Sequence, residues 1–222
     1  MIDIRRAAIL GMALLAQGCL DAPVGPAGGP LSTACAVPRL AATPDPPKRA
    51  NAPGNPPAPV LTAAELTGLA DCVRPALAAA MRDSEAPAAR AYASWPRYSS
   101  RPFGSEHGSY LEIFANDKAS AFGRFEDAGV LPDCAIVVKH HFSVSGTGAV
   151  SRGPLLTMQK MQPGFNPPTA DWRFTMITPD GKIAGETAGR NATAVDFCLE
   201  CHKAAWRQDF LMFVPPEFRR MP

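Results

Sequence analysis

A short motif of cysteine and histidine near the C-terminus constrains this chain more than any other feature. Cys198 and Cys201 are separated by two residues, and His202 follows at once. This C-x-x-C-H pattern is typical of covalent c-type haem attachment, because two thiols bond to the porphyrin edge while the next histidine reaches the iron. The motif predicts haem c as the cofactor, with both cysteines as thioether anchors and His202 as the proximal iron ligand.

Paired cysteines at this spacing also occur in redox dithiols and in zinc sites. A zinc site needs a second pair of ligands, and the sequence offers none at a usable spacing. A thioredoxin-like dithiol lies near the start of a βαβ domain, which a C-terminal position does not provide. A chance match is the remaining alternative. Haem attachment is the interpretation that agrees best with an exported protein.

The first 18 residues have the organisation of a secretory signal peptide. Arg5 and Arg6 precede an apolar run at residues 7–16, which is too short to span a membrane. Small residues before Cys19 suit ordinary signal peptidase, whereas a cysteine directly after the cut suits lipoprotein processing. We therefore expect an exported, periplasmic protein, which is either released or anchored to the membrane by lipid on Cys19.

Residues 19–60 resemble a disordered tether, since they are rich in Pro, Ala and Gly and hold nearly half of the chain's 24 prolines. The rest, about 160 residues, suits one domain. We divide it into a helical segment at 61–94 and a haem domain at 95–222. The formal net charge of +2 and the scattered basic residues give no indication of nucleic-acid binding.

Three further cysteines, Cys35, Cys72 and Cys134, allow at most one disulfide among themselves. A bridge between Cys35 and Cys72 is plausible in an oxidising compartment, but the sequence alone does not choose the pairing.

The pattern of the domain predicts an α+β fold, with a mainly antiparallel sheet and packed helices. Thr62 and Glu65 resemble a capping box that starts a helix over residues 62–82, bent or broken near Pro75. Further helical pieces are predicted at 86–93, after a cap at Asn116 or Asp117, and from the haem motif through Trp206. Strands are predicted at 110–115, 136–144, 155–161 and 172–178, followed by a tight turn at 179–182 into another short strand.

The strand at residues 136–144 contains a lysine in an apolar setting. Lys139 shares one face with Val137 and His141, because side chains alternate along a strand. A buried lysine is costly unless it is paired, deprotonated or covalently used. The alternative is an edge strand from which the ammonium group reaches water.

Several segments together resemble the cytochrome P-460 family over roughly residues 95–215. They occur in the same order as in that family. The matching segments are His107-Gly108, 110–116, 131–139, Met158-x-Lys160, Asp171-Trp172, Asp180-Gly181 and the terminal C-x-x-C-H motif.

The resemblance implies an antiparallel β domain with packed helices, similar to the beta-type cytochromes c-prime, and commonly a homodimer. It implies a five-coordinate haem iron bound by His202. In the P-460 members a lysine is also cross-linked to the porphyrin, and that position here is Lys139. These enzymes oxidise hydroxylamine, which would make this chain an oxidoreductase that passes electrons to a redox partner protein.

Two departures from the family pattern stand out. Cys134 replaces a glycine in the turn before the Lys139 strand. The segment that carries a distal carboxylate in the hydroxylamine-oxidising members, residues 155–161 here, contains no Asp or Glu.

Two other functions compete with hydroxylamine oxidation. One is non-catalytic binding of nitric oxide, as in the beta-type cytochromes c-prime. The other is simple electron transfer, which requires a sixth iron ligand; Met158, Met161 and Met176 are candidates by residue type.

Overall fold

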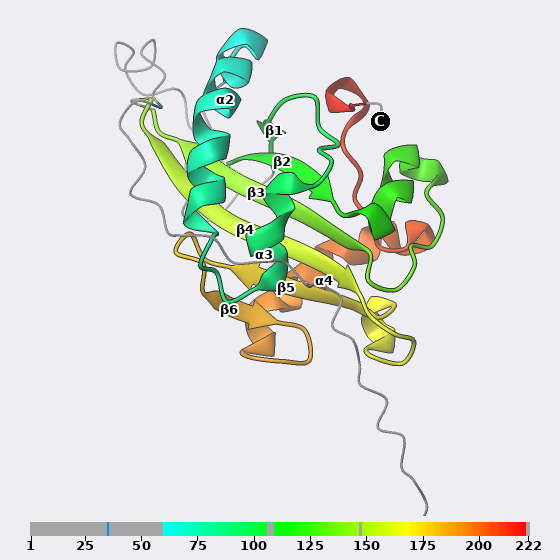
Figure 1. Cartoon of the computed structure of the whole chain (residues 1–222). Coiled ribbons are helices and arrows are strands. Elements are labelled where there is room, and N and C mark those ends of the chain that lie inside the picture. Colours follow the sequence, from blue (N-terminus) through cyan, green and yellow to red (C-terminus); the bar gives the residue numbers. More distant parts are fainter. Residues whose placement is uncertain (1–34, 36–59, 106–108, 147, 221–222) are drawn as a thin grey trace, which may run out of the picture.

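The computed structural model describes residue 35 and residues 60–105, 109–146 and 148–220 (Figure 1). The predicted signal peptide, the predicted lipid site at Cys19, most of the predicted tether and His107-Gly108 lie outside these ranges. Within them, no helix combines the length and the apolar character needed to cross a membrane.

One antiparallel sheet of six strands forms the centre of the domain, and the strands follow one another in space as they do in the chain. The predicted α+β class is therefore confirmed. The sequence missed the two-residue β1, and it predicted the start of β4 at residue 155 instead of Val150. The strands are β1 (Phe103–Gly104), β2 (Tyr110–Ala115), β3 (Ile136–Val144), β4 (Val150–Lys160), β5 (Trp172–Ile177) and β6 (Ile183–Glu186).

Strand β3 lies inside this sheet, paired with β2 on one side and β4 on the other. Ile136 and Val138 on one face and Val137 on the other are all buried, as expected for a strand covered on both faces. The alternation of side chains places Lys139 and His141 on one face and His140 on the other. The alternative that Lys139 lies on an edge strand is therefore wrong.

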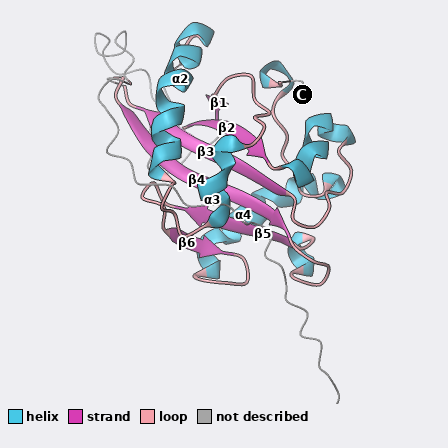
Figure 2. Ribbon diagram, viewed as in Figure 1, coloured by secondary structure: helices cyan, strands magenta, loops and turns pink. Residues whose placement is uncertain are grey.

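Two helices, α2 (Ala63–Ala80) and α3 (Pro87–Ala91), cover the His140 face of the sheet (Figure 2). The predicted capping box is confirmed, because Thr62 and Glu65 bond reciprocally. Of the two alternatives at Pro75, a bend or a break, the break is wrong, since α2 continues past the proline. Buried leucine and valine residues on both sides of the proline pack against β2 and β3, and this packing maintains the helix.

A disulfide joins Cys35 to Cys72 of α2. This is the pairing that the sequence offered as one possibility. Cys35 is buried, and it packs with Leu69 and Val73 beside the sheet. The bridge therefore attaches this point of the predicted tether to the folded domain.

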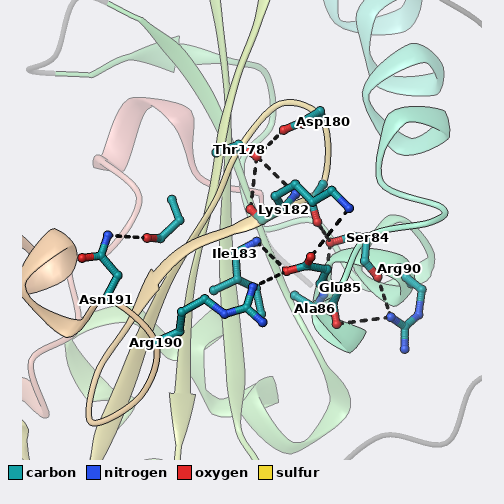
Figure 3. Close-up of polar contacts among 12 residues, drawn as sticks. Ser84, Glu85, Ala86, Arg90, Thr178, Asp180, Lys182, Ile183, Arg190 and Asn191 are labelled. Atoms are coloured by element: carbon teal, nitrogen blue, oxygen red, sulfur yellow. Dashed lines mark hydrogen bonds and ion pairs between the residues drawn. The ribbon is translucent and has the colours of Figure 1, made fainter.

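A polar network connects the segment after α2 to the hairpin between β5 and β6 (Figure 3). The Ser84 hydroxyl donates to the Gly181 carbonyl at 2.8 Å. The Glu85 carboxylate accepts from the Ile183 amide at 3.2 Å and from Arg190 at 2.7 Å. The link between α2 and α3 is thus fixed to the β5–β6 edge of the sheet.

A buried carboxylate anchors α2 to β2. Glu112 accepts from Arg74 at 3.0 Å with both of its oxygens and from Arg97 at 2.6 Å. Two guanidinium groups on one carboxylate satisfy its oxygens, so the charge is tolerated although the Glu112 side chain is only 6% exposed.

The opposite face of the sheet is covered by short helices and by the C-terminal part of the chain. Val195, Cys198, Leu211 and Val214 belong to the same apolar core as the β2 and β3 residues of this face. Asn116, one of the two predicted caps, begins the short helix before β3. The short helices after β2 are η2 (Asp117–Asp127), η3 (Pro167–Thr169), η4 (Ala192–Val195), α4 (Asp196–His202), η5 (Lys203–Gln208) and η6 (Pro216–Phe218), whereas η1 (Tyr92–Ser94) continues α3 on the His140 face.

His140 lies under α3, where its Nδ1 atom shares a hydrogen bond with the Tyr92 hydroxyl. Burial, with a smaller contribution from His141, lowers the pKa of His140 to about 3. Burial also raises the pKa of Tyr92. The phenol therefore donates the proton and the neutral imidazole accepts it.

This buried imidazole predicts loss of stability in acid. The unfolded chain takes up a proton on residue 140 below about pH 6.5, while the folded protein does not, so the stabilisation is complete above pH 6.5 and is lost as the pH falls toward 3. We expect His140 to cost about 2 kcal/mol of unfolding free energy between pH 7 and pH 5. Denaturant unfolding of the wild type and of His140→Asn at both pH values tests this. An equal pH dependence in the two proteins would contradict it.

Candidate functional site

A cavity lies between α4 and the Lys139 face of the sheet. Its volume is about 300 Å³, at the lower end of the roughly 300–1,000 Å³ typical of ligand sites. Four predicted site residues line it together, although about sixty positions separate the first from the others: Lys139, Cys198, Cys201 and His202. Most of the remaining wall is apolar, with Leu111, Ile113, Val137, Leu156, Met158, Phe174, Phe197, Met212 and Phe213.

Helix α4 presents the motif residues to this cavity. Residues at positions i, i+3 and i+4 share one face of a helix, so Cys198, Cys201 and His202 point the same way. Both cysteines are free thiols. Cys198 is buried and Cys201 is exposed, and burial raises the pKa of Cys198 to about 11. Two reduced thiols at the mouth of an apolar cavity are the groups that thioether attachment requires.

His202 is held in one tautomer by the backbone. Its Nδ1 atom lies 2.6 Å from the Phe210 carbonyl oxygen, which only accepts hydrogen bonds, so Nδ1 carries the proton. Burial, and secondarily the charge of Lys139, lower the pKa of His202 to about 4. The side chain is therefore a neutral imidazole with a lone pair on Nε2, which is the form that ligates iron.

Lys139 projects from the middle of β3, where it is flanked by Ile113 of β2 and Leu156 of β4. The side chain is half-buried and lines the cavity. It also lies close enough to Cys198 and His202 to affect the pKa of each. The predicted cross-linking residue and the predicted attachment residues thus face the same space.

His141 also lines this cavity, although no role was predicted for it from the sequence. It is only 4% exposed, and its Nδ1 atom lies 3.0 Å from the Ser109 hydroxyl oxygen. The signal was present in the alternation of β3, which places His141 on the Lys139 face. What the sequence did not show is that this face borders a cavity.

The cavity wall has no acidic side chain among its described residues, in agreement with the absence of Asp and Glu from residues 155–161. Of the three methionines considered as a sixth iron ligand, only Met158 lines the cavity; Met161 and Met176 do not. Elsewhere in the described part of the chain, no three His, Cys, Asp or Glu side chains gather as they would to hold a bare metal ion.

These residues fit a haem group. The apolar walls suit a porphyrin, the two thiols suit its vinyl substituents, and the oriented Nε2 of His202 suits its iron.

Comparison with known proteins agrees with this site. A model of the Cytochrome P460 family matches residues 89–213, which is more than half of the chain. The chain therefore belongs to the cytochrome P460 family, and haem is its cofactor. No curated protein matches the sequence.

Cys134, the residue that replaces the family's turn glycine, adopts the conformation that glycine favours. Its φ angle is +65°, in the left-handed region, and its amide donates to the Lys160 carbonyl at 2.9 Å. Cys134 therefore occupies a left-handed position and joins the turn before β3 to the end of β4.

If His202 ligates the iron, added imidazole should restore the haem spectra of a variant that lacks this side chain. In His202→Gly we expect the ferric absorption and electron paramagnetic resonance spectra to change, because the iron loses its protein ligand. Added imidazole should restore them toward those of the wild type. His140→Asn is the matched control, since His140 faces away from the cavity, and its haem spectra should stay unchanged. Wild-type spectra in His202→Gly without imidazole would exclude His202 as the ligand.

Proposed function

We propose that this protein is an exported mono-haem cytochrome of the P-460 type that oxidises hydroxylamine. The observation that carries the proposal is the cavity in which Lys139 faces Cys198, Cys201 and His202. A haem bound there supplies a redox-active iron with a coordination position for a small nitrogenous ligand.

The chain's own residues have separable roles in this proposal. The S–H groups of Cys198 and Cys201 add across the two vinyl double bonds, which needs no oxidant. The neutral Nε2 of His202 would hold the iron. Lys139 would hold the porphyrin through a bond from Nζ, for whose formation each partner would lose one hydrogen. That step is a two-electron oxidation, and it requires an oxidant such as dioxygen or a peroxide.

Oxidation of hydroxylamine also requires removal of protons. The described cavity wall offers no carboxylate, and histidine is the commonest general base in enzymes. We assign proton removal to His141, whose ring is oriented by the Ser109 hydroxyl. Electrons leave to a redox partner protein.

Export is part of the proposal, with a periplasmic location, cleavage after residue 18 and a possible lipid anchor at Cys19. The Cys35 to Cys72 disulfide supports it, since such bonds persist mainly in oxidising compartments. A homodimer is expected from the family.

Nitric oxide binding without catalysis is the second candidate function. The apolar character of the described wall, whose described residues include no acidic side chain, favours this candidate, because a gas needs no proton acceptor.

The cross-link predicts a covalent product that mass spectrometry can detect. Protease digestion of the wild type should give a haem-bearing fragment that contains the Lys139 peptide as well as the Cys198 and Cys201 peptide. In Lys139→Met the haem should remain on the cysteine peptide alone, with an ordinary c-type spectrum after denaturation. Lys118→Met, at an exposed lysine outside the cavity, should behave as the wild type. An ordinary c-type spectrum in the wild type would exclude the cross-link and favour nitric oxide binding.

Proton removal by His141 predicts a kinetic defect. We expect His141→Leu to lower kcat for hydroxylamine with an artificial electron acceptor by roughly 10²–10⁴-fold, the usual contribution of a general base. Nitric oxide affinity should change much less, because that ligand loses no proton. His140→Asn, one position along the strand but on the other face, is the control. No turnover by the wild type with intact, cross-linked haem would count against the enzyme function itself.

A further inference from the structure

The loop that holds His202 is strained. Asp209 and Phe210 are consecutive non-glycine residues with φ angles of 55° and 60°, both in the left-handed region. This conformation brings the side chain close to the backbone, and it is least favourable for a bulky residue such as Phe210. Strain of this kind persists only where surrounding contacts enforce it, and it often marks functional sites.

The contacts that enforce the strain converge on Asp209. Its carboxylate accepts from Lys160 Nζ at 2.5 Å and from the Leu131 amide at 3.0 Å. Its carbonyl oxygen accepts from Trp172 Nε1 at 2.8 Å. The Asp209 and Lys160 side chains are only 3% and 9% exposed, and the Lys160 ammonium also lies 4.9 Å from the centre of the Trp172 ring. Three separate elements, β4, β5 and the turn before β3, thus fix one residue.

This cluster does not border the cavity, because Lys160, Trp172 and Asp209 are all absent from its described wall. Its connection to the site runs through the backbone. Phe210 follows Asp209 directly, and the Phe210 carbonyl is the group that accepts the Nδ1 proton of His202.

A buried ion pair is seldom retained for stability alone, because desolvation offsets much of the attraction between the charges. We propose that Asp209 is a positioning residue, held by Lys160 and Trp172, that aims the Phe210 carbonyl at His202 and so sets the donor strength of the iron ligand. A short hydrogen bond from Nδ1 makes the imidazole a stronger donor, which stabilises ferric iron and lowers the reduction potential. The inference rests on the part of the proposed function that makes His202 the ligand, and it holds for either candidate activity.

Two variants test the inference in the haem-loaded protein. Asp209→Asn keeps an oxygen for the Leu131 amide but removes the charge that pairs with Lys160. Trp172→Phe keeps an aromatic ring but removes the N–H donor to the Asp209 carbonyl. In both we expect the iron–histidine stretching band of the ferrous protein, measured by resonance Raman spectroscopy, to move to lower frequency. The reduction potential should rise, with the larger shift in Asp209→Asn, and Asp209→Glu should return part of it.

Glu112→Gln is the matched control, since it breaks another buried ion network on the opposite face of the sheet. It should lower the Tm while leaving the Raman band and the potential at their wild-type values. An unchanged band and potential in Asp209→Asn and Trp172→Phe, with only a lower Tm, would overturn the positioning role. Failure of His202 ligation is a separate outcome, visible as a wild-type band that survives in His202→Gly.

Discussion

Burial of β3 on both faces is the constraint on which the other elements depend. A strand with neighbours on each side has its hydrogen bonds satisfied within the sheet, so only its faces remain to be covered. Helices α2 and α3 cover one face, while the short C-terminal helices cover the other and leave room for a cavity. The alternation of side chains then separates the two histidines, since Lys139 and His141 line the cavity while His140 lies buried on the other face.

The sequence predicted those features that depend only on residues close together in the chain. The capping box at Thr62, the alternation along residues 136–144 and the C-x-x-C-H spacing each concern neighbours in the chain, and the structure contains them all. A break at Pro75 is not observed. Proline removes one hydrogen bond from a helix, but the packing of α2 on the sheet outweighs that loss.

Contacts between residues far apart in the chain could not be predicted from the sequence. Nothing near Asp209 indicates that Lys160 and Trp172 meet it, because those residues lie on other strands. His141 was likewise visible as a residue of the Lys139 face, but its role depends on where α4 docks. The family resemblance supplied the expectation that Lys139 is the position of a cross-link. The geometry added the reason that a lysine is tolerated there, since it borders a space and not a packed interior.

The shared cavity of Lys139 and Cys198 also has a consequence for the unfolded chain. A molecule bonded to both residues closes a covalent ring that includes β4, β5 and β6. A ring of about 60 residues removes enough chain entropy to stabilise the folded state by about 4 kcal/mol, as a disulfide of that span does. A cross-linked cofactor would thus connect the middle of the polypeptide covalently to its C-terminal part. Protein with the complete cross-link would then resist denaturation better than protein without it.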